Sequence, residues 1–207
     1  LDLTENTVVV FFSDNGGLRQ RFDGKGEVVT TNAPLRAEKG TLYEGGIREP
    51  LIVRWPGLVK PGSVCNVPVS SVDFYPTFLE AAGAAGDPNH VLDGESLVPL
   101  LKQTGSLKRD AIFWHYPHYH HSTPAGAIRQ GDWKLIEFFE DNRLELYNVR
   151  TDIGEKNNLA DKMPQKAREL HQKLAAWRRS VRAEMPTPNP DFEPARRFEW
   201  GRHPGRK

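Results

Sequence analysis

The stretch Thr7–Gly17, with the sequence T-V-V-V-F-F-S-D-N-G-G, indicates the fold class of this 207-residue chain. Its first part is an uninterrupted run of β-branched and aromatic residues, from Val8 to Phe12. Such a run predicts a strand that is buried on both faces, as in a parallel sheet covered by helices. We therefore expect an α/β fold.

Polar residues follow directly where this strand ends. Asp14 and Asn15 offer a carboxylate and an amide oxygen, which suit a hard cation such as Ca²⁺ or Mg²⁺. Ligands of open α/β sheets bind beyond the carboxyl ends of the strands, which is where this pair falls. Asn-Gly is also a hairpin turn signal, and for these residues alone a turn is the simpler interpretation.

A second stretch, Ala33–Gly57, has the sequence A-P-L-R-A-E-K-G-T-L-Y-E-G-G-I-R-E-P-L-I-V-R-W-P-G. Together with S-D-N-G-G it closely resembles the type I sulfatases of the alkaline-phosphatase-like superfamily. The resemblance implies that Asp14 and Asn15 ligate a divalent cation, usually Ca²⁺, and that Lys39 binds the sulfate. It continues through three further segments, Val72–Gly83, Asp93–Leu101 and Leu146–Ala160.

The resemblance also implies a mechanism. A formylglycine hydrate attacks the sulfur of a sulfate ester, the metal and Lys39 counter the negative charge of the sulfate, and the alcohol departs. Lys39 is thereby expected to act in catalysis as well as in binding. Lys39 begins the family motif K-G-T-x-x-E-G-G, which we call the Lys39 motif, and the turn around the lysine is called the Lys39 loop. Glu44, Arg48 and Glu49 belong to the same motif, and we expect them to hold the Lys39 loop through ion pairs and hydrogen bonds.

The nucleophile motif of these sulfatases, C-x-P/A-x-R or its serine form, is not found in the sequence. The single cysteine, Cys65, is followed by Val67 and Val69 where the motif needs Pro or Ala and then Arg. We therefore expect the chain to be the C-terminal portion of a sulfatase, with its nucleophile in an N-terminal half of the same fold. Alone, it is predicted to be inactive.

Three parts are predicted along the chain. Residues 1–104 are expected to be the C-terminal part of an alkaline-phosphatase-like mixed sheet flanked by helices, with a second buried strand at Pro50–Trp55. Within it, Ser70 and Asp73 have the spacing of a capping box. Residues 105–185 are expected to form a small antiparallel sheet plus a helix, and residues 186–207 an extended, Pro-rich basic tail.

The second part has clear signals for its elements. Four strands are predicted: Ala111–His115, Ala125–Gln130, Trp133–Phe139 and Arg143–Tyr147. A helix of roughly 20 residues follows from Pro164, since proline suits a first helical position. Its apolar stripe is predicted to pack on the sheet and contains Ala167, Leu170, Leu174, Trp177 and Val181. In the tail, Phe192, Phe198 and Trp200 are expected to lie across the body.

Composition excludes some function classes. The 28 basic and 27 acidic residues nearly cancel, so there is no electrostatic case for nucleic acid. No apolar run approaches the ~20 residues of a membrane span. One cysteine cannot form an internal disulfide. The compartment rests on the resemblance, which implies a periplasmic or secreted protein.

Four of the seven histidines fall in Trp114–His121, with the sequence W-H-Y-P-H-Y-H-H. Zinc binding is one interpretation, although Pro117 breaks helical pairing of the ligands. Structural or surface histidines are a second. The third is substrate recognition, because aromatic rings and histidines suit sugars. His115 and His118 are the predicted contacts to a sulfated glycan.

Two alternatives to a carbohydrate sulfatase remain open. One is a phosphatase or phosphonate hydrolase of the same superfamily, which also uses metal-ligating aspartates. The other is a non-catalytic chain that binds sulfated glycans or another subunit, which the absent nucleophile would suit.

Overall fold

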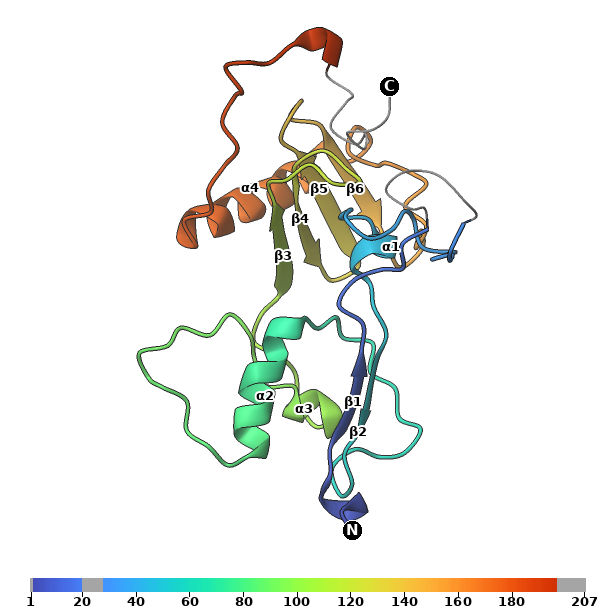
Figure 1. Ribbon diagram of the computed structural model, residues 1–207, viewed down its shortest axis with the longest axis vertical. Coiled ribbons are helices and arrows are strands. Elements are labelled where there is room, and N and C mark those ends of the chain that lie inside the picture. Colours follow the sequence, from blue (N-terminus) through green and yellow to red (C-terminus); the bar gives the residue numbers. More distant parts are fainter. Residues whose placement is uncertain (1, 20–27, 197–207) are drawn as a thin grey trace. The chain divides into compact units, whose positions relative to one another are not determined.

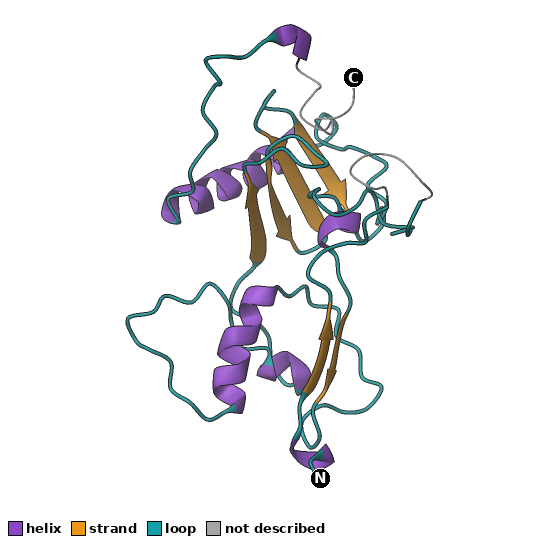
Figure 2. Cartoon of the chain, viewed as in Figure 1, coloured by secondary structure: helices purple, strands orange, loops and turns teal. Residues whose placement is uncertain are grey.

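The computed structural model describes residues 2–19 and 28–196, which form two compact units (Figures 1 and 2). Unit 1 comprises residues 1–14 and 49–112, and unit 2 comprises residues 15–48 and 113–207. This division differs from the predicted boundary at residue 104. Residues 15–48 group with the C-terminal sheet because Arg36 and Glu44 bond to partners more than 100 residues away.

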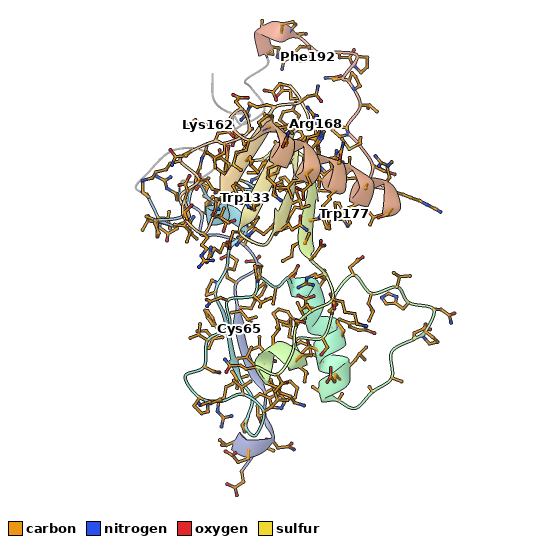
Figure 3. The ribbon with its side chains drawn as sticks, turned by 180° about the vertical axis from the view of Figure 1, so that it is seen from behind. Cys65, Trp133, Lys162, Arg168, Trp177 and Phe192 are labelled. Carbon is orange, nitrogen blue, oxygen red and sulfur yellow. The ribbon has the colours of Figure 1, made fainter. Side chains whose placement is uncertain are left out.

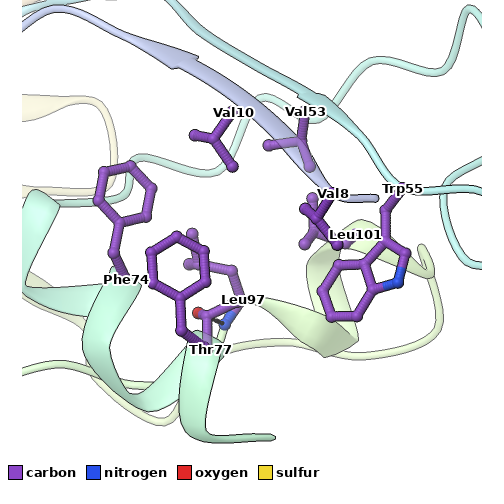
Figure 4. Close-up of a pocket in the computed structure, with 9 residues that line it drawn as sticks. Val8, Val10, Val53, Trp55, Phe74, Thr77, Leu97 and Leu101 are labelled. Carbon is purple, nitrogen blue, oxygen red and sulfur yellow. Dashed lines mark hydrogen bonds between the residues drawn. The ribbon is translucent and has the colours of Figure 1, made fainter. Parts of the chain in front are cut away.

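Unit 1 contains a two-stranded antiparallel sheet. Strand β1 (Val9–Phe12) pairs with β2 (Leu51–Arg54), with Val9 opposite Arg54 and Phe12 opposite Leu51. One face of this sheet packs on helices. Figure 4 shows Val10 and Val53 pointing toward α2 (Phe74–Ala81) across a small apolar pocket that α3 (Val98–Leu101) also lines.

The other face of this sheet is open to solvent among the described residues. Val9, Phe11 and Ile52 are 50%, 60% and 64% exposed. The prediction of a strand buried on both faces in a parallel sheet is therefore wrong for β1, and Pro50–Trp55 is buried on one face only. The reason is that an antiparallel partner and one layer of helices cover only alternate side chains.

The start of α2 is fixed by a capping box, as predicted. The backbone N–H of Ser70 donates to the Asp73 carboxylate at 2.8 Å, within the 3₁₀ turn η2 (Ser71–Asp73) that precedes the helix. The fully buried Asp73 also accepts a bidentate pair of bonds from Arg109 and one from the backbone N–H of Glu95. Burial alone would raise the pKa of Asp73, but these hydrogen bonds outweigh it and lower that pKa.

Unit 2 is built on a four-stranded sheet of order β3-β4-β5-β6. The strands are β3 (Ala111–Tyr116), β4 (Ala125–Gln130), β5 (Trp133–Phe138) and β6 (Leu144–Asn148), all within one residue of the prediction. The pairs β4–β5 and β5–β6 are antiparallel. The core of this unit includes Leu42, which comes from the distant Lys39 motif.

Helix α4 (Pro164–Ser180) packs against β4, β5 and β6. Three stripe residues are buried as predicted: Ala167, Leu170 and Leu174. Trp177, labelled in Figure 3, stacks on Phe113 with ring centroids 4.9 Å apart. Val181 follows the last residue of α4 and is 46% exposed, so its place in the stripe is a wrong prediction.

The C-terminal segment is described as far as Arg196. It has no regular element until the 3₁₀ turn η3 (Pro194–Arg196), which agrees with an extended tail. Phe192 is exposed, contrary to the prediction that it lies across the body, while Phe198 and Trp200 lie outside the described residues.

None of the described helices combines the length and the apolar character that crossing a membrane requires. Cys65 (Figure 3) is an exposed free thiol.

Candidate active site

The turn that begins at Asn15 is bonded to α1 (Glu44–Ile47), the short helix that ends the Lys39 motif. The backbone N–H of Gly16 donates to the carbonyl oxygen of Gly46 at 3.1 Å. A Cβ on Gly16 would lie 1.7 Å from the carbonyl oxygen of Gly45, so only glycine allows the two segments to approach this closely. The close backbone contact therefore fixes the Asn15 turn against the Lys39 motif.

Asp14 precedes this turn as the last residue of the first segment of unit 1. In the same unit, Oε1 of Glu49 is buried without a hydrogen-bond partner. Burial raises the pKa of Glu49, and the negative charge of Asp14 raises it further. Two neighbouring carboxylates with an orphaned oxygen fit a hard cation, which prefers oxygen ligands. The charge of Glu49 is thus coupled to that of Asp14, and the expectation that Glu49 holds the Lys39 loop stays a prediction.

Among residues 2–19 and 28–196, no group of three or more His, Cys, Asp or Glu side chains is arranged to hold a metal ion. The predicted ligands Asp14 and Asn15 would offer one side-chain group each, whereas Ca²⁺ takes six to eight oxygen ligands. A cation held here would need further ligands beyond this pair.

Lys39 lies at the exposed tip of a tight loop. The backbone N–H and the hydroxyl of Thr41 both donate to the carbonyl oxygen of Glu38, at 3.2 and 2.8 Å, and close the turn around the lysine. Within the described part of the chain, Lys39 makes no hydrogen bond or ion pair. Its ammonium group is thus available to an anion.

Two histidines that we did not predict as contacts lie against this loop. A Cβ on Gly40, which has a φ of +81°, would come within 1.9 Å of Nδ1 of His120. The neighbouring ring of His121 lies 4.5 Å from that of His120, and its Nδ1 lies 3.7 Å from Oε1 of Glu38. Gly40 therefore leaves the space into which the His120 ring fits.

The electrostatics of His120 reflect this position. Burial lowers its pKa, and the electrostatic interactions with His121 and Lys39 lower it further. The neutral form of the His120 ring is therefore favoured. Its place beside Lys39 was beyond sequence reasoning, since 81 residues separate them and only the density of histidines marked the segment.

The two predicted contacts lie elsewhere on the same segment. His115, on β3, has its Nε2 2.7 Å from the carbonyl oxygen of Glu184, and its ring packs on Phe139 at 5.5 Å. His118 is exposed and meets the ring of Tyr116 edge to face at 5.7 Å. His115 is thus partly committed to the fold, whereas His118 is open to a ligand.

A buried ion cluster lies behind the Lys39 loop. Lys134 of β5 is completely buried, and its Nζ lies 2.9 Å from Oε1 of both Glu44 and Glu155. Arg48 and Arg129 lie 3.3 and 3.6 Å from Oε2 of Glu44. The expectation that Glu44 and Arg48 hold the loop through ion pairs is confirmed.

The two carboxylates of this cluster differ in acidity. Burial would raise the pKa of Glu44, but Lys134, Arg129 and Arg48 outweigh it and lower that pKa. For Glu155, burial prevails over the attraction of Lys134 and raises the pKa. The number of cations around each carboxylate accounts for the difference.

Solved structures with similar folds define the class of this protein. The structure of Ps i-CgsB in complex with k-i-k-neocarrahexaose has 31% identity and a TM-score of 0.69, over 84% of this chain and 37% of that one. BT4656 in complex with its substrate D-glucosamine-2-N,6-O-disulfate has 32% identity and a TM-score of 0.65, over 86% and 35%. The chain has the alkaline-phosphatase-like fold of the sulfatases.

The chain belongs to the family described as N-sulphoglucosamine sulphohydrolase, C-terminal, whose model matches residues 37–180. It is 40% identical to a sulfatase of Formosa agariphila, over 84% of this chain and 33% of that protein. It is 42% identical to human arylsulfatase A, over 67% and 26%. The chain thus spans about a third or less of the length of these relatives.

A weaker likeness extends to another hydrolase. The phosphonate monoester hydrolase of Silicibacter pomeroyi has 28% identity and a TM-score of 0.54, over 68% of this chain and 30% of that one. The TM-score and the coverage are lower than those of the two sulfatase-fold structures above.

Proposed function

We propose that this chain is the C-terminal part of an enzyme that hydrolyses sulfate esters of a carbohydrate. The observation that carries the proposal is Lys39, an exposed cation without a partner among the described residues, at the tip of a loop anchored by a buried ion cluster. In this proposal, Lys39 donates hydrogen bonds to the sulfate oxygens and stabilises the charge that builds up on them. Membership of a sulfatase family supports this role.

A divalent cation, Ca²⁺ or alternatively Mg²⁺, is proposed as the cofactor. Asp14 and Asn15 would hold it, together with ligands from outside this sequence. When bound, such a cation neutralises charge on sulfate oxygens and lowers the pKa of a nucleophile. The nucleophile proposed is a formylglycine in an N-terminal part of the same fold, so residues 1–207 alone are expected to be inactive.

The exposed face of the β1–β2 sheet supports an N-terminal partner segment. Val9, Phe11 and Ile52 form an apolar row on this face, and such a surface favours burial against another layer. The chain covers only 33% of its relative from Formosa agariphila, which supports a larger fold for the whole protein. Family resemblance further supports a periplasmic or secreted location.

The substrate proposed is a sulfated sugar. BT4656, a structural relative, was solved with a sulfated glucosamine as its substrate. The loop that carries His118, His120 and His121 offers ring faces and hydrogen-bonding nitrogens suited to sugar hydroxyls. His115 remains a predicted contact, and His120 of the same histidine segment is added because it lies beside the Lys39 loop.

A panel of esters tests this proposal. The full-length protein, with Ca²⁺, is given sulfated glucosamines, an aryl sulfate, the matching phosphate and a phosphonate monoester. Turnover of the sulfates at least 10²-fold faster than the others would support a sulfatase, since site-specific electrostatics discriminate on this order. Preference for the phosphonate or phosphate would establish the superfamily alternative. Binding without turnover of any ester would favour a non-catalytic glycan-binding chain.

A further inference from the structure

Glu155 touches both ends of the Lys39 loop. Its carboxylate Oε2 accepts a hydrogen bond from the backbone N–H of Glu44 at 2.7 Å, five residues after Lys39. Its backbone carbonyl oxygen accepts one from the guanidinium of Arg36 at 2.9 Å, three residues before Lys39. A direct bond from the N–H of Gly45 to the carbonyl oxygen of Arg36, at 2.7 Å, closes the loop between these two anchors.

Lys134 completes this arrangement from the sheet. It is completely buried on β5 and bridges the carboxylates of Glu44 and Glu155. A buried cation is costly unless its charge is compensated, so it holds both carboxylates firmly in place. Because β5 is an inner strand of the four-stranded sheet, Lys134 ties the Lys39 loop to a rigid element.

The backbone of Glu155 adopts an uncommon conformation. Its φ is +51°, in the left-handed region that a residue with a long side chain seldom occupies. Such a conformation persists where surrounding contacts determine it. Here those contacts are the ion pair with Lys134 and the two hydrogen bonds to the ends of the Lys39 loop.

We propose that Glu155 and Lys134 are positioning residues for Lys39: they fix both ends of the loop and so place its ammonium group for the sulfate. This inference rests on the proposed function of Lys39. Neither residue is expected to touch substrate. Their effect is expected on binding of the sulfate group and on turnover, and it passes through the backbone of residues 36–45.

Two variants of Glu155 separate its charge from its hydrogen bond. Glu155→Gln keeps an oxygen that can accept from the N–H of Glu44 and loses the negative charge, whereas Glu155→Ala loses both. Lys166→Met is the matched control for Lys134→Met, because Lys166 pairs with Glu169 on the surface of α4. Arg36→Gln is a milder variant, should Glu155→Ala fail to fold.

Two readouts are measured in the full-length protein. Hydrogen exchange reports protection of the backbone amides of Glu44 and Gly45, and inhibition by inorganic sulfate reports the anion site. We expect Glu155→Ala and Lys134→Met to lose amide protection and to weaken sulfate inhibition by about tenfold to 10²-fold, as misplaced groups do. Glu155→Gln and Lys166→Met should stay within about threefold of wild type, and Arg36→Gln should fall between the two groups.

Unchanged sulfate inhibition in Glu155→Ala with lost amide protection would overturn the inference, since the loop would be loosened without effect on Lys39. Unchanged protection would overturn it as well. A wild-type protein that neither hydrolyses sulfate esters nor binds sulfate would instead refute the proposed function, and the exchange data would still decide whether Glu155 fixes the loop.

Discussion

The carboxylate of Glu155 accepts a hydrogen bond from the backbone N–H of Glu44 at 2.7 Å, although 111 positions separate them. The ammonium group of Lys134 lies 2.9 Å from the carboxylate of Glu155 and 2.9 Å from that of Glu44. Three segments far apart in the sequence thus meet in one buried cluster that anchors the Lys39 loop. The cluster explains why residues 15–48 belong to the C-terminal unit.

The first prediction concerns the stability of this cluster. Lys134→Met should lower the free energy of unfolding by about 3–5 kcal/mol, because two buried carboxylates lose their shared cation. The double variant Lys134→Met/Glu155→Gln should recover part of that loss, since one of the buried charges is removed. Urea unfolding of the full-length protein measures both, and a double variant no more stable than Lys134→Met would contradict the explanation.

The fit of His120 against Gly40 gives a second prediction. Gly40→Ala places a methyl group 1.9 Å from Nδ1 of His120 at a φ of +81°. Gly62→Ala is a matched control, because Gly62 has a φ of +72° and no atom within 4 Å of an added Cβ. Backbone strain should cost each variant about 1–2 kcal/mol. Only Gly40→Ala should also raise KM, and equal KM values would argue against a role for this contact.

Asp73 should make folding sensitive to acid. Its folded pKa is below the ordinary value of 3.8, so its carboxylate stabilises the fold above that pH. The contribution is lost as pH falls through the folded pKa. Asp73→Asn should cost about 3 kcal/mol at pH 7, since the partly buried Arg109 loses its partner.

Melting curves from pH 7 to 2 test this account. The stability of Asp73→Asn should depend less on pH below 4 than that of wild type, because the titrating group has been removed. Asp87→Asn, at an exposed aspartate, is the control. Parallel curves for Asp73→Asn and wild type would show that Asp73 does not carry the acid sensitivity.

The histidine segment offers a comparison within the molecule. His118→Ala removes an exposed ring that meets Tyr116 edge to face, and His120→Ala removes a ring beside the Lys39 loop. Each should raise KM for a sulfated glycan by about three- to tenfold, the loss of one or two hydrogen bonds. The double variant His115→Ala/His118→Ala should do so at least as strongly. Unchanged kinetics in all three would remove this segment from the substrate site.

Sequence reasoning was most successful where the signal is local. The stripe of α4 and the turns between β4, β5 and β6 depend on residues within a few positions of one another. The strands beside these turns were predicted within one residue, and four of the five stripe residues lie in the helix. The apolar run of β1 was misjudged, because composition does not reveal how many layers cover a strand. Val9 and Phe11 are exposed for that reason.

Long-range contacts explain what was missed in the candidate site. Lys134 sits in a strand whose sequence gives no sign that a lysine is buried, and its partners lie 90 and 21 positions away. His120 reaches Gly40 from a loop without regular structure. Glu44 and Arg48 were predicted because they share a motif with Lys39.

Lys39 itself provides the most direct test of the central claim. We would measure kcat and KM of full-length Lys39→Ala on a sulfated glucosamine, with Lys162→Ala, at an exposed lysine of the same unit, as control. The proposed role predicts a loss in rate on the order of 10²-fold or more for Lys39→Ala and no change for the control. A loss of less than about threefold would contradict the assignment of Lys39 to the sulfate and, with it, the proposed site.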